Sequence, residues 1–146
     1  MATPPTIYVL NGPNLNLLGT REPEIYGAET LDEIAGALED RARELGLAID
    51  MRQSNHEGHL IDWLHEASSE GARAVILNAG AFTHSSIALY DAIKAIRVPV
   101  IEVHLSNPQA REPFRRRSYV AAAAKGSISG FGALGYQLAL DAAASL

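Results

Sequence analysis

Short apolar runs alternate along this chain with segments in which apolar residues recur at helical spacing. Continuous apolar runs are typical of strands buried in a parallel sheet, whereas apolar residues three and four apart indicate one face of a helix. The segment 47–53 instead alternates apolar and polar residues, which predicts a strand with one wetter face, near a sheet edge. The predicted strands are residues 7–10, 47–53, 75–78, 98–103 and 127–129.

Helical patterns fill the intervals between these strands. Thr30 and Glu33 form a capping-box signature before the first helix, and Ser85 is the expected cap of the third. The predicted helices are residues 31–45, 60–67 and 87–96, a short helix carrying Arg111 and Arg115 to Arg117, and a last helix from about Ala133.

This alternation predicts an α/β fold with a five-stranded parallel sheet, right-handed crossovers and helices on both faces. The result is a doubly wound, three-layer α/β/α domain spanning residues 1–146. In the strand order 2-1-3-4-5, the crevice for a ligand lies between the loops after Leu10 and after Asn78.

Residues 15–27 show neither helical nor strand periodicity, although they contain two glycines and Pro23. A loop of this length inside a compact domain is usually a lid or a binding loop. Residues 1–6 are expected to form a flexible N-terminus.

Composition narrows the functional classes. The formal net charge of −5 argues against a nucleic-acid binder, and the lack of cysteine excludes disulfides and thiolate chemistry. No apolar run approaches the ~20 residues that span a membrane, and no leader pattern is present. A cytoplasmic protein without a membrane partner is therefore expected.

Polar side chains follow three of the predicted strands: Asn14, then Asn78 with His84, then Glu102 with His104. Residues at i and i+2 leave the same face of a strand, so Glu102 could orient His104 as a general acid or base. The alternatives are a satisfied polar pair at a strand end and, for Asn78, a side chain that caps its own turn.

Arg21 and Tyr26 lie on the lid-like segment. A guanidinium within ~4–6 Å of a tyrosine lowers the pKa of its hydroxyl by ~1–3 units, which would make it a base. The alternative is a tyrosine ring packed on the body of the protein and a solvated arginine.

Charged residues in the third helix and after the fourth strand have open roles. Asp91 either faces solvent or reaches the site of a neighbouring subunit. The residues Arg115 to Arg117 could neutralise an anionic substrate or a nucleic-acid phosphate, or form a solvated helix face, which is the expectation for Arg116 and Arg117. Arg111 and Arg115 could share one face.

Three motifs point elsewhere. The glycines of residues 130–135 match a dinucleotide fingerprint, which keeps open a nucleotide- or phosphate-binding module, but the acidic partner ~20 residues on is missing. His56 and His59 are one residue short of the zinc-protease spacing. Lys94 and Lys125 lie away from the predicted crevice, which argues against a Schiff base.

Several motifs together resemble the type II 3-dehydroquinate dehydratases, from about Ile7 to the final helix. They are Asn11-Gly12-Pro13-Asn14-Leu15, Arg21-Glu22-Pro23 with Tyr26-Gly27, Gln53-Ser54-Asn55-His56-Glu57-Gly58, Asn78-Ala79-Gly80-Ala81-Phe82-Thr83-His84 and Glu102-Val103-His104-Leu105-Ser106-Asn107.

The resemblance implies a flavodoxin-like fold and dehydration of 3-dehydroquinate to 3-dehydroshikimate, with no cofactor, metal or Schiff base. It implies that Tyr26 is the base, that Arg21 supports it, and that Asn14 holds a water for the enolate. It also implies that His104, oriented by Glu102, protonates the leaving hydroxyl in a trans elimination. The implied substrate contacts are Asn78, His84, the backbone amides of Leu105 and Ser106, Arg115, and Asp91 from a neighbouring subunit.

The family resembled here assembles as a dodecamer, a tetramer of trimers. It serves either the shikimate pathway of aromatic amino acid and chorismate biosynthesis or quinate catabolism, and the sequence does not distinguish the two. Gln109, Pro113, His59 and the segment 120–124 depart from the usual pattern, which concerns local helix geometry and subunit contacts rather than the reaction.

Overall fold

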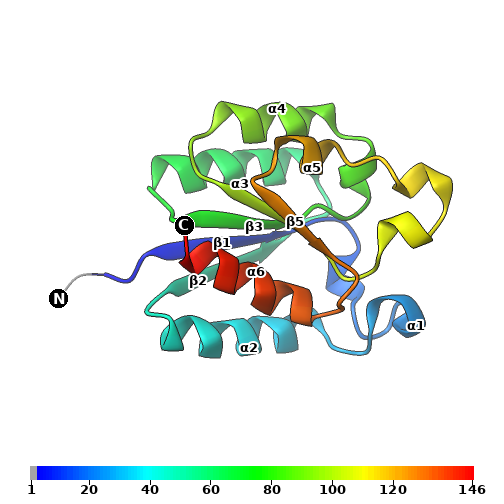
Figure 1. Ribbon diagram of the computed structural model, residues 1–146, viewed down its shortest axis with the longest axis horizontal. Coiled ribbons are helices and arrows are strands. Elements are labelled where there is room, and N and C mark those ends of the chain that lie inside the picture. Colours follow the sequence, from blue (N-terminus) through cyan, green and yellow to red (C-terminus); the bar gives the residue numbers. More distant parts are fainter. Residues whose placement is uncertain (1–2) are drawn as a thin grey trace.

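The computed structural model describes residues 3–146 and contains one five-stranded sheet with the order β2-β1-β3-β4-β5 (Figure 1). All neighbouring strands are parallel, as predicted. The strands are β1 (Thr6–Asn11), β2 (Ala48–Gln53), β3 (Ala74–Asn78), β4 (Val100–His104) and β5 (Gly126–Ser129).

Helices cover both faces of the sheet, which gives the predicted three layers (Figure 1). On one face lie α2 (Leu31–Glu44) and α6 (Leu134–Ala144). On the other face lie α3 (Glu57–Ser69), α4 (Ile87–Ala95) and α5 (Tyr119–Ala123). No helix among residues 3–146 is long and apolar enough to cross a membrane.

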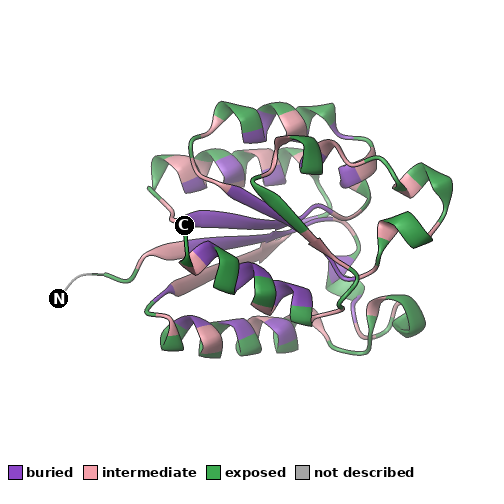
Figure 2. Ribbon diagram, in the orientation of Figure 1, coloured by how far each residue is buried: buried purple, intermediate pink, exposed green. Residues whose placement is uncertain are grey.

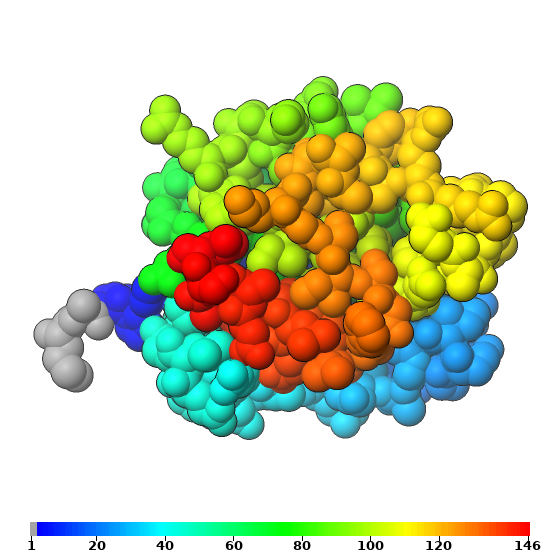
Figure 3. Space-filling model, viewed as in Figure 1, coloured from blue at the N-terminus to red at the C-terminus, as the bar shows by residue number. Residues whose placement is uncertain are grey.

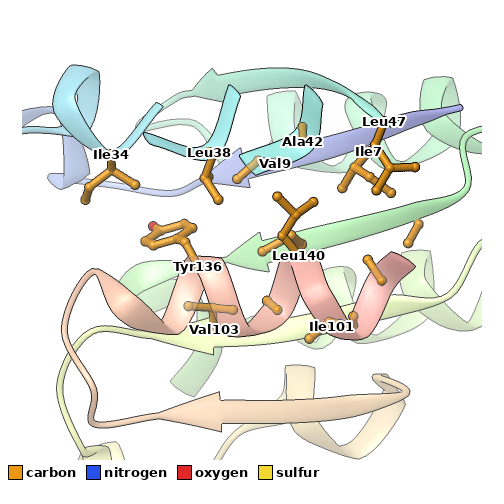
Figure 4. Packing of buried hydrophobic residues seen from close by; sticks show 14 of the residues in the cluster. Ile7, Val9, Ile34, Leu38, Ala42, Leu47, Ile101, Val103, Tyr136 and Leu140 are labelled. Carbon is orange, nitrogen blue, oxygen red and sulfur yellow. The ribbon is translucent and has the colours of Figure 1, made fainter. Parts of the chain in front are cut away.

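The core is split by the sheet because successive side chains of a strand point to opposite faces. Ile7 and Val9 of β1 pack toward α2 and α6, where Leu38 and Leu140 meet them (Figure 4). The next residue along β1, Leu10, packs toward the other helices. Figure 2 shows the central strands buried throughout, which is why they read as continuous apolar runs.

The helix caps confirm one expectation and correct another. Thr30 and Glu33 form the predicted capping box of α2. The cap of α4 is Ser86, whose hydroxyl accepts a hydrogen bond from the Leu89 backbone, and not Ser85. Ser85 is instead the C-cap of the 3₁₀ helix η2 (Gly80–His84), and its backbone N–H donates to the Phe82 carbonyl.

Short helical turns occur where the sequence suggested none, or a different one. Residues 15–27 contain η1 (Leu15–Leu17) and α1 (Pro23–Tyr26). The arginine-bearing helix is in fact two 3₁₀ turns, η3 (Pro108–Ala110) and η4 (Pro113–Arg115). Both η3 and η4 begin at a proline, which opens a helical turn readily but disrupts the interior of a longer helix.

Strand ends also differ by a residue or two from the predicted limits. The expected flexible N-terminus, residues 1–6, falls partly on residues 1 and 2, which lie outside the described residues. Thr6 belongs to β1, and the Pro5 carbonyl accepts a hydrogen bond from Ala48 of β2. Pro99 lies before β4, and its carbonyl accepts a hydrogen bond from Val75.

The loops after β1 and β3 touch at the point where the winding of the sheet reverses. The Gly12 N–H donates to the Asn78 carbonyl over 2.8 Å. A Cβ at residue 12 would lie 2.4 Å from the Ala79 oxygen, so only glycine fits this approach. The close contact fixes where the two loops begin, and with them the base of the crevice.

Candidate active site

A cavity of about 240 Å³ lies at the carboxyl edge of the sheet, between the loops after β1, β3 and β4. In Figure 3 the segments that overhang it, around residue 25 (light blue) and residue 110 (yellow), lie next to each other at one end of the molecule. Its lining includes nine residues named from the sequence: Asn14, Arg21, Tyr26, Asn78, His84, His104, Leu105, Ser106 and Arg115.

Two other predicted residues do not line this cavity. Glu102 is 2% exposed and lies behind His104, on the same face of β4. Asp91 is exposed on α4, outside the cavity of its own chain. Within one chain the structure therefore brings Glu102 to the site only through His104, and it does not bring Asp91 there.

His104 and Glu102 form a buried pair. The His104 Nε2 lies 2.9 Å from the Glu102 carboxylate, which also accepts hydrogen bonds from Ser118 and, over 2.7 Å, from Ser127. Burial alone would raise the pKa of Glu102, but the bonds from His104 and the two serines hold that pKa below its ordinary value. Glu102 is thus an anion that orients the ring and leaves Nδ1 as the nitrogen free for other partners.

His84 is held in a defined tautomer by a backbone group. Its Nδ1 lies 2.8 Å from the Arg117 carbonyl, and a carbonyl only accepts, so Nδ1 carries the proton. In the neutral ring Nε2 is then an acceptor. The ring stacks on His104 with the centroids 6.4 Å apart and the planes at 18°.

Tyr26 lies beside two guanidinium groups. The Arg21 guanidinium carbon is 4.5 Å from the centre of the tyrosine ring, and that of Arg111 is 5.1 Å away. The sequence indicates Arg111 only as a partner of Arg115, and its contact with Tyr26 is visible only in the structure. Positive charge over the ring stabilises negative charge on the phenol oxygen.

The arginines after β4 divide as expected. Arg111 donates to the Ser106 hydroxyl over 3.2 Å, and Arg115 donates to the Glu112 carboxylate over 3.2 Å. Both line the cavity, although Arg111 lies outside the two 3₁₀ turns and so shares no helical face with Arg115, whereas Arg116 and Arg117 are exposed.

The two asparagines of the site are each held by a hydrogen bond to another residue. Asn14 has φ 69°, in the left-handed region, and its N–H donates to the Asn55 side chain over 3.1 Å. The Asn78 side-chain oxygen accepts from the Gly80 N–H over 3.2 Å. Asn78 therefore caps its own turn and lines the cavity at once, so the two readings of this residue are compatible.

The motifs that pointed elsewhere have structural roles. The Gly130 and Gly132 amides donate to the carbonyls of His104 and Leu105, over 3.3 and 2.9 Å, so they are not turned toward a phosphate. Lys94 and Lys125 lie by the start of β4, at the edge of the sheet opposite the cavity.

His59 bonds to Ser54 over 2.7 Å at the start of α3. Within residues 3–146, no group of three or more His, Cys, Asp or Glu side chains is placed to hold a metal ion.

Comparisons with known proteins agree over nearly the whole chain. The family described as dehydroquinase class II matches residues 5–144. A 3-dehydroquinate dehydratase of Phenylobacterium zucineum is 60% identical over 140 residues, which cover 96% of each chain.

Solved structures lead to the same family. A type II dehydroquinase from Propionibacterium acnes has a TM-score of 0.93 and 44% identity, covering 100% of this chain and 99% of the other. One from Butyrivibrio crossotus has a TM-score of 0.94 and 38% identity, covering 97% and 99%. The chain therefore belongs to the class II dehydroquinase family.

Proposed function

We propose that this protein dehydrates 3-dehydroquinate to 3-dehydroshikimate by trans elimination through an enolate. A relative with 60% identity bears the name of this activity. The observation that carries the proposal is that Tyr26, flanked by guanidinium groups, and His104, held by a carboxylate, line one cavity from separate elements.

The first step removes a proton from the carbon next to the ketone. Tyr26, as phenolate, takes this proton, and Arg21 and Arg111 stabilise the negative charge of the base. The electron pair of the broken C–H bond moves toward the ketone oxygen, and a water held by Asn14 stabilises the enolate. The cavity lining contains no lysine, so the ketone is not set up to form an imine.

The second step expels the hydroxyl. The enolate electrons form the new carbon–carbon double bond as the C–O bond breaks, and His104 gives a proton so that water leaves. Glu102 engages Nε2, which leaves Nδ1 to reach the hydroxyl, and its charge stabilises the imidazolium before transfer. Base and acid come from α1 and β4, which allows them to act on opposite faces of the substrate.

The remaining lining residues suit a polar, anionic substrate. Arg115 and the backbone amides of Leu105 and Ser106 would hold carboxylate and hydroxyl oxygens, and Asn78 and His84 would hold further hydroxyls. Asp91 completes the site from a neighbouring subunit in a dodecamer. Contact between α4 and a neighbouring subunit is supported by Ile87, which is 58% exposed and lies one turn before Asp91.

The test of the catalytic pair is turnover by purified variants. Tyr26→Phe and His104→Ala should each lower kcat by roughly 10²- to 10⁴-fold, because each removes a proton-transfer group. The matched control is Tyr119→Phe, since Tyr119 also lies beside a guanidinium, that of Arg117, but outside the cavity. Near-normal turnover of Tyr26→Phe would contradict its role as the base.

The absence of a metal and of an imine is tested separately. Dehydroquinate turnover should be unchanged by a chelator and by borohydride, and inhibition by either would overturn the corresponding part of the mechanism. Cytoplasmic location, and service in chorismate biosynthesis or in quinate breakdown, stay predictions.

A further inference from the structure

Tyr136 is a fully buried tyrosine whose hydroxyl ends at the catalytic edge of the sheet. It projects from α6 with 0% exposure, and its ring packs beside Leu38 and Val9 (Figure 4). It does not line the cavity, and its ring belongs to an apolar cluster, so only its hydroxyl meets polar partners.

The hydroxyl connects two asparagines at the ends of β1 and β3. It donates to the Asn11 side-chain oxygen over 2.6 Å and accepts from the Asn78 side-chain nitrogen over 3.0 Å. Asn78 lines the cavity, whereas Asn11 is fully buried. The chain of bonds therefore runs from the interior of the protein to a wall of the site.

The bonds in this chain have one consistent direction. The Asn11 amide nitrogen donates to the Arg52 carbonyl over 3.0 Å, so its oxygen must face Tyr136 and take the hydroxyl proton. The hydroxyl is then an acceptor toward Asn78, which must present its nitrogen there and its oxygen to the Gly80 N–H.

A reversed Asn78 amide is excluded by the same bonds. It would set a nitrogen donor against the Gly80 N–H and an oxygen against a hydroxyl whose proton is already used. Burial raises the pKa of Tyr136 far above its ordinary value, which keeps the hydroxyl protonated at any working pH.

We propose that Tyr136 is a positioning residue that fixes which atoms of the Asn78 amide face the substrate. The second amide hydrogen and the second oxygen lone pair of Asn78 are then offered in a set arrangement. This inference rests on the proposed function, in which Asn78 contacts the substrate.

The test is Tyr136→Phe, which keeps the ring and removes the hydroxyl. Loss of the hydrogen bond that orients the Asn78 amide should raise KM for dehydroquinate roughly three- to tenfold. The value of kcat should stay within about twofold. The matched control is Tyr8→Phe, which removes a part-buried hydroxyl bonded to Glu66 on the other face of the sheet. It should leave KM unchanged, whatever it does to the melting temperature.

Asn78→Ala and the double variant separate the possible failures. If Tyr136 acts through Asn78, then Tyr136→Phe adds no further rise in KM to Asn78→Ala. An additive rise, or an unchanged KM in Tyr136→Phe beside a raised KM in Asn78→Ala, would overturn the positioning role. An unchanged KM in Asn78→Ala would instead overturn the proposed substrate contact.

Asn11→Leu provides a second route if Tyr136→Phe does not fold. It removes the acceptor of the Tyr136 proton while keeping the hydroxyl, which can then donate to Asn78, so that only the Gly80 N–H still opposes the reversed amide. KM should rise as in Tyr136→Phe. An unchanged KM in folded Asn11→Leu would also count against the inference.

Discussion

At the scale of single residues, the site depends on what surrounds each reactive group rather than on unusual residue types. Tyr26 is partly exposed, and its ring lies beside the guanidinium groups of Arg21 and Arg111. His104 is buried, and its ring is bonded to Glu102, whose carboxylate accepts hydrogen bonds from two serines. The proposed base thus lies among surface charges, and the proposed acid is held by hydrogen bonds in the interior.

Arg21→Ala should reduce kcat more than it reduces stability. A guanidinium over an aromatic ring contributes ~0.5–2 kcal/mol, which corresponds to a roughly 2- to 30-fold loss of rate. Arg21 is partly buried but lies outside both apolar clusters of the core, so the melting temperature should change little more than in the exposed control Arg116→Ala. A large fall in melting temperature would contradict this assignment.

The Glu102 carboxylate should make stability depend on pH in the acid range. Its pKa is lower in the folded protein than the ordinary 4.5, so the unfolded chain binds its proton first. The stabilisation is therefore complete above that value and is lost as the pH falls below it.

Glu102→Gln should accordingly lose less unfolding free energy than the parent protein between about pH 5 and pH 3, as measured by urea denaturation. Glu24→Gln, at an exposed position, is the matched control and should keep the parent's pH dependence. Identical slopes for Glu102→Gln and the parent would show that the carboxylate is not the group responsible.

The sequence predicted the residues that line the cavity better than those that support them. Asn78, His84 and His104 could be found because strand order brings strand ends together, and this needs no side-chain detail. Tyr136 could not, because a tyrosine at an apolar helix position is usually core, and its partner Asn11 lies 125 positions away.

At the scale of elements, the fit between the loops after β1 and β3 sets the geometry of the crevice. Gly12→Ala should therefore destabilise the fold by ~1–3 kcal/mol and reduce turnover, because the new Cβ meets the Ala79 backbone, which must move.

Gly36→Ala is the matched control for this substitution. Gly36 lies within α2, and a Cβ there meets nothing within 4 Å. It should stabilise the protein by up to ~1 kcal/mol and leave turnover unchanged. A Gly12→Ala variant as stable as the parent in urea titrations would show that the two loops can separate freely.

Element prediction was accurate for the sheet and the long helices and poor for the short turns. The hydrophobic pattern predicts the strands and α2, and the Thr30 cap marks the start of α2. α1 and α5 contain four and five residues, too few for a period of 3.6 to be visible. Ser85 and Ser86 are chemically equal as caps, and the choice between them depended on η2, which the sequence did not reveal.

At the scale of the whole molecule, the role proposed for Asp91 would link activity to assembly. It is exposed on α4 and does not line the cavity of its own chain. Large apolar side chains are also exposed, including Ile87, Phe131 and Leu134, as expected of surfaces that meet other copies.

Mixed oligomers provide the measurement for this link. Asp91→Ala and Tyr26→Phe subunits should each be nearly inactive alone. After unfolding and refolding together they should recover part of the activity, since some sites then combine an intact Tyr26 with an intact Asp91 from a neighbour. No recovery in mixtures that assemble normally would mean that each chain's site is complete by itself.

Tyr26 lies on a partly exposed helix, whereas His104 lies on a buried strand. In the proposed cycle, the tyrosine ends with one proton more, and the imidazole with one proton fewer, than each had at the start. Only the surrounding solvent can restore them. A tritium atom at the attacked carbon should therefore end in the medium, whereas the oxygen of the expelled water should come from the substrate's own hydroxyl.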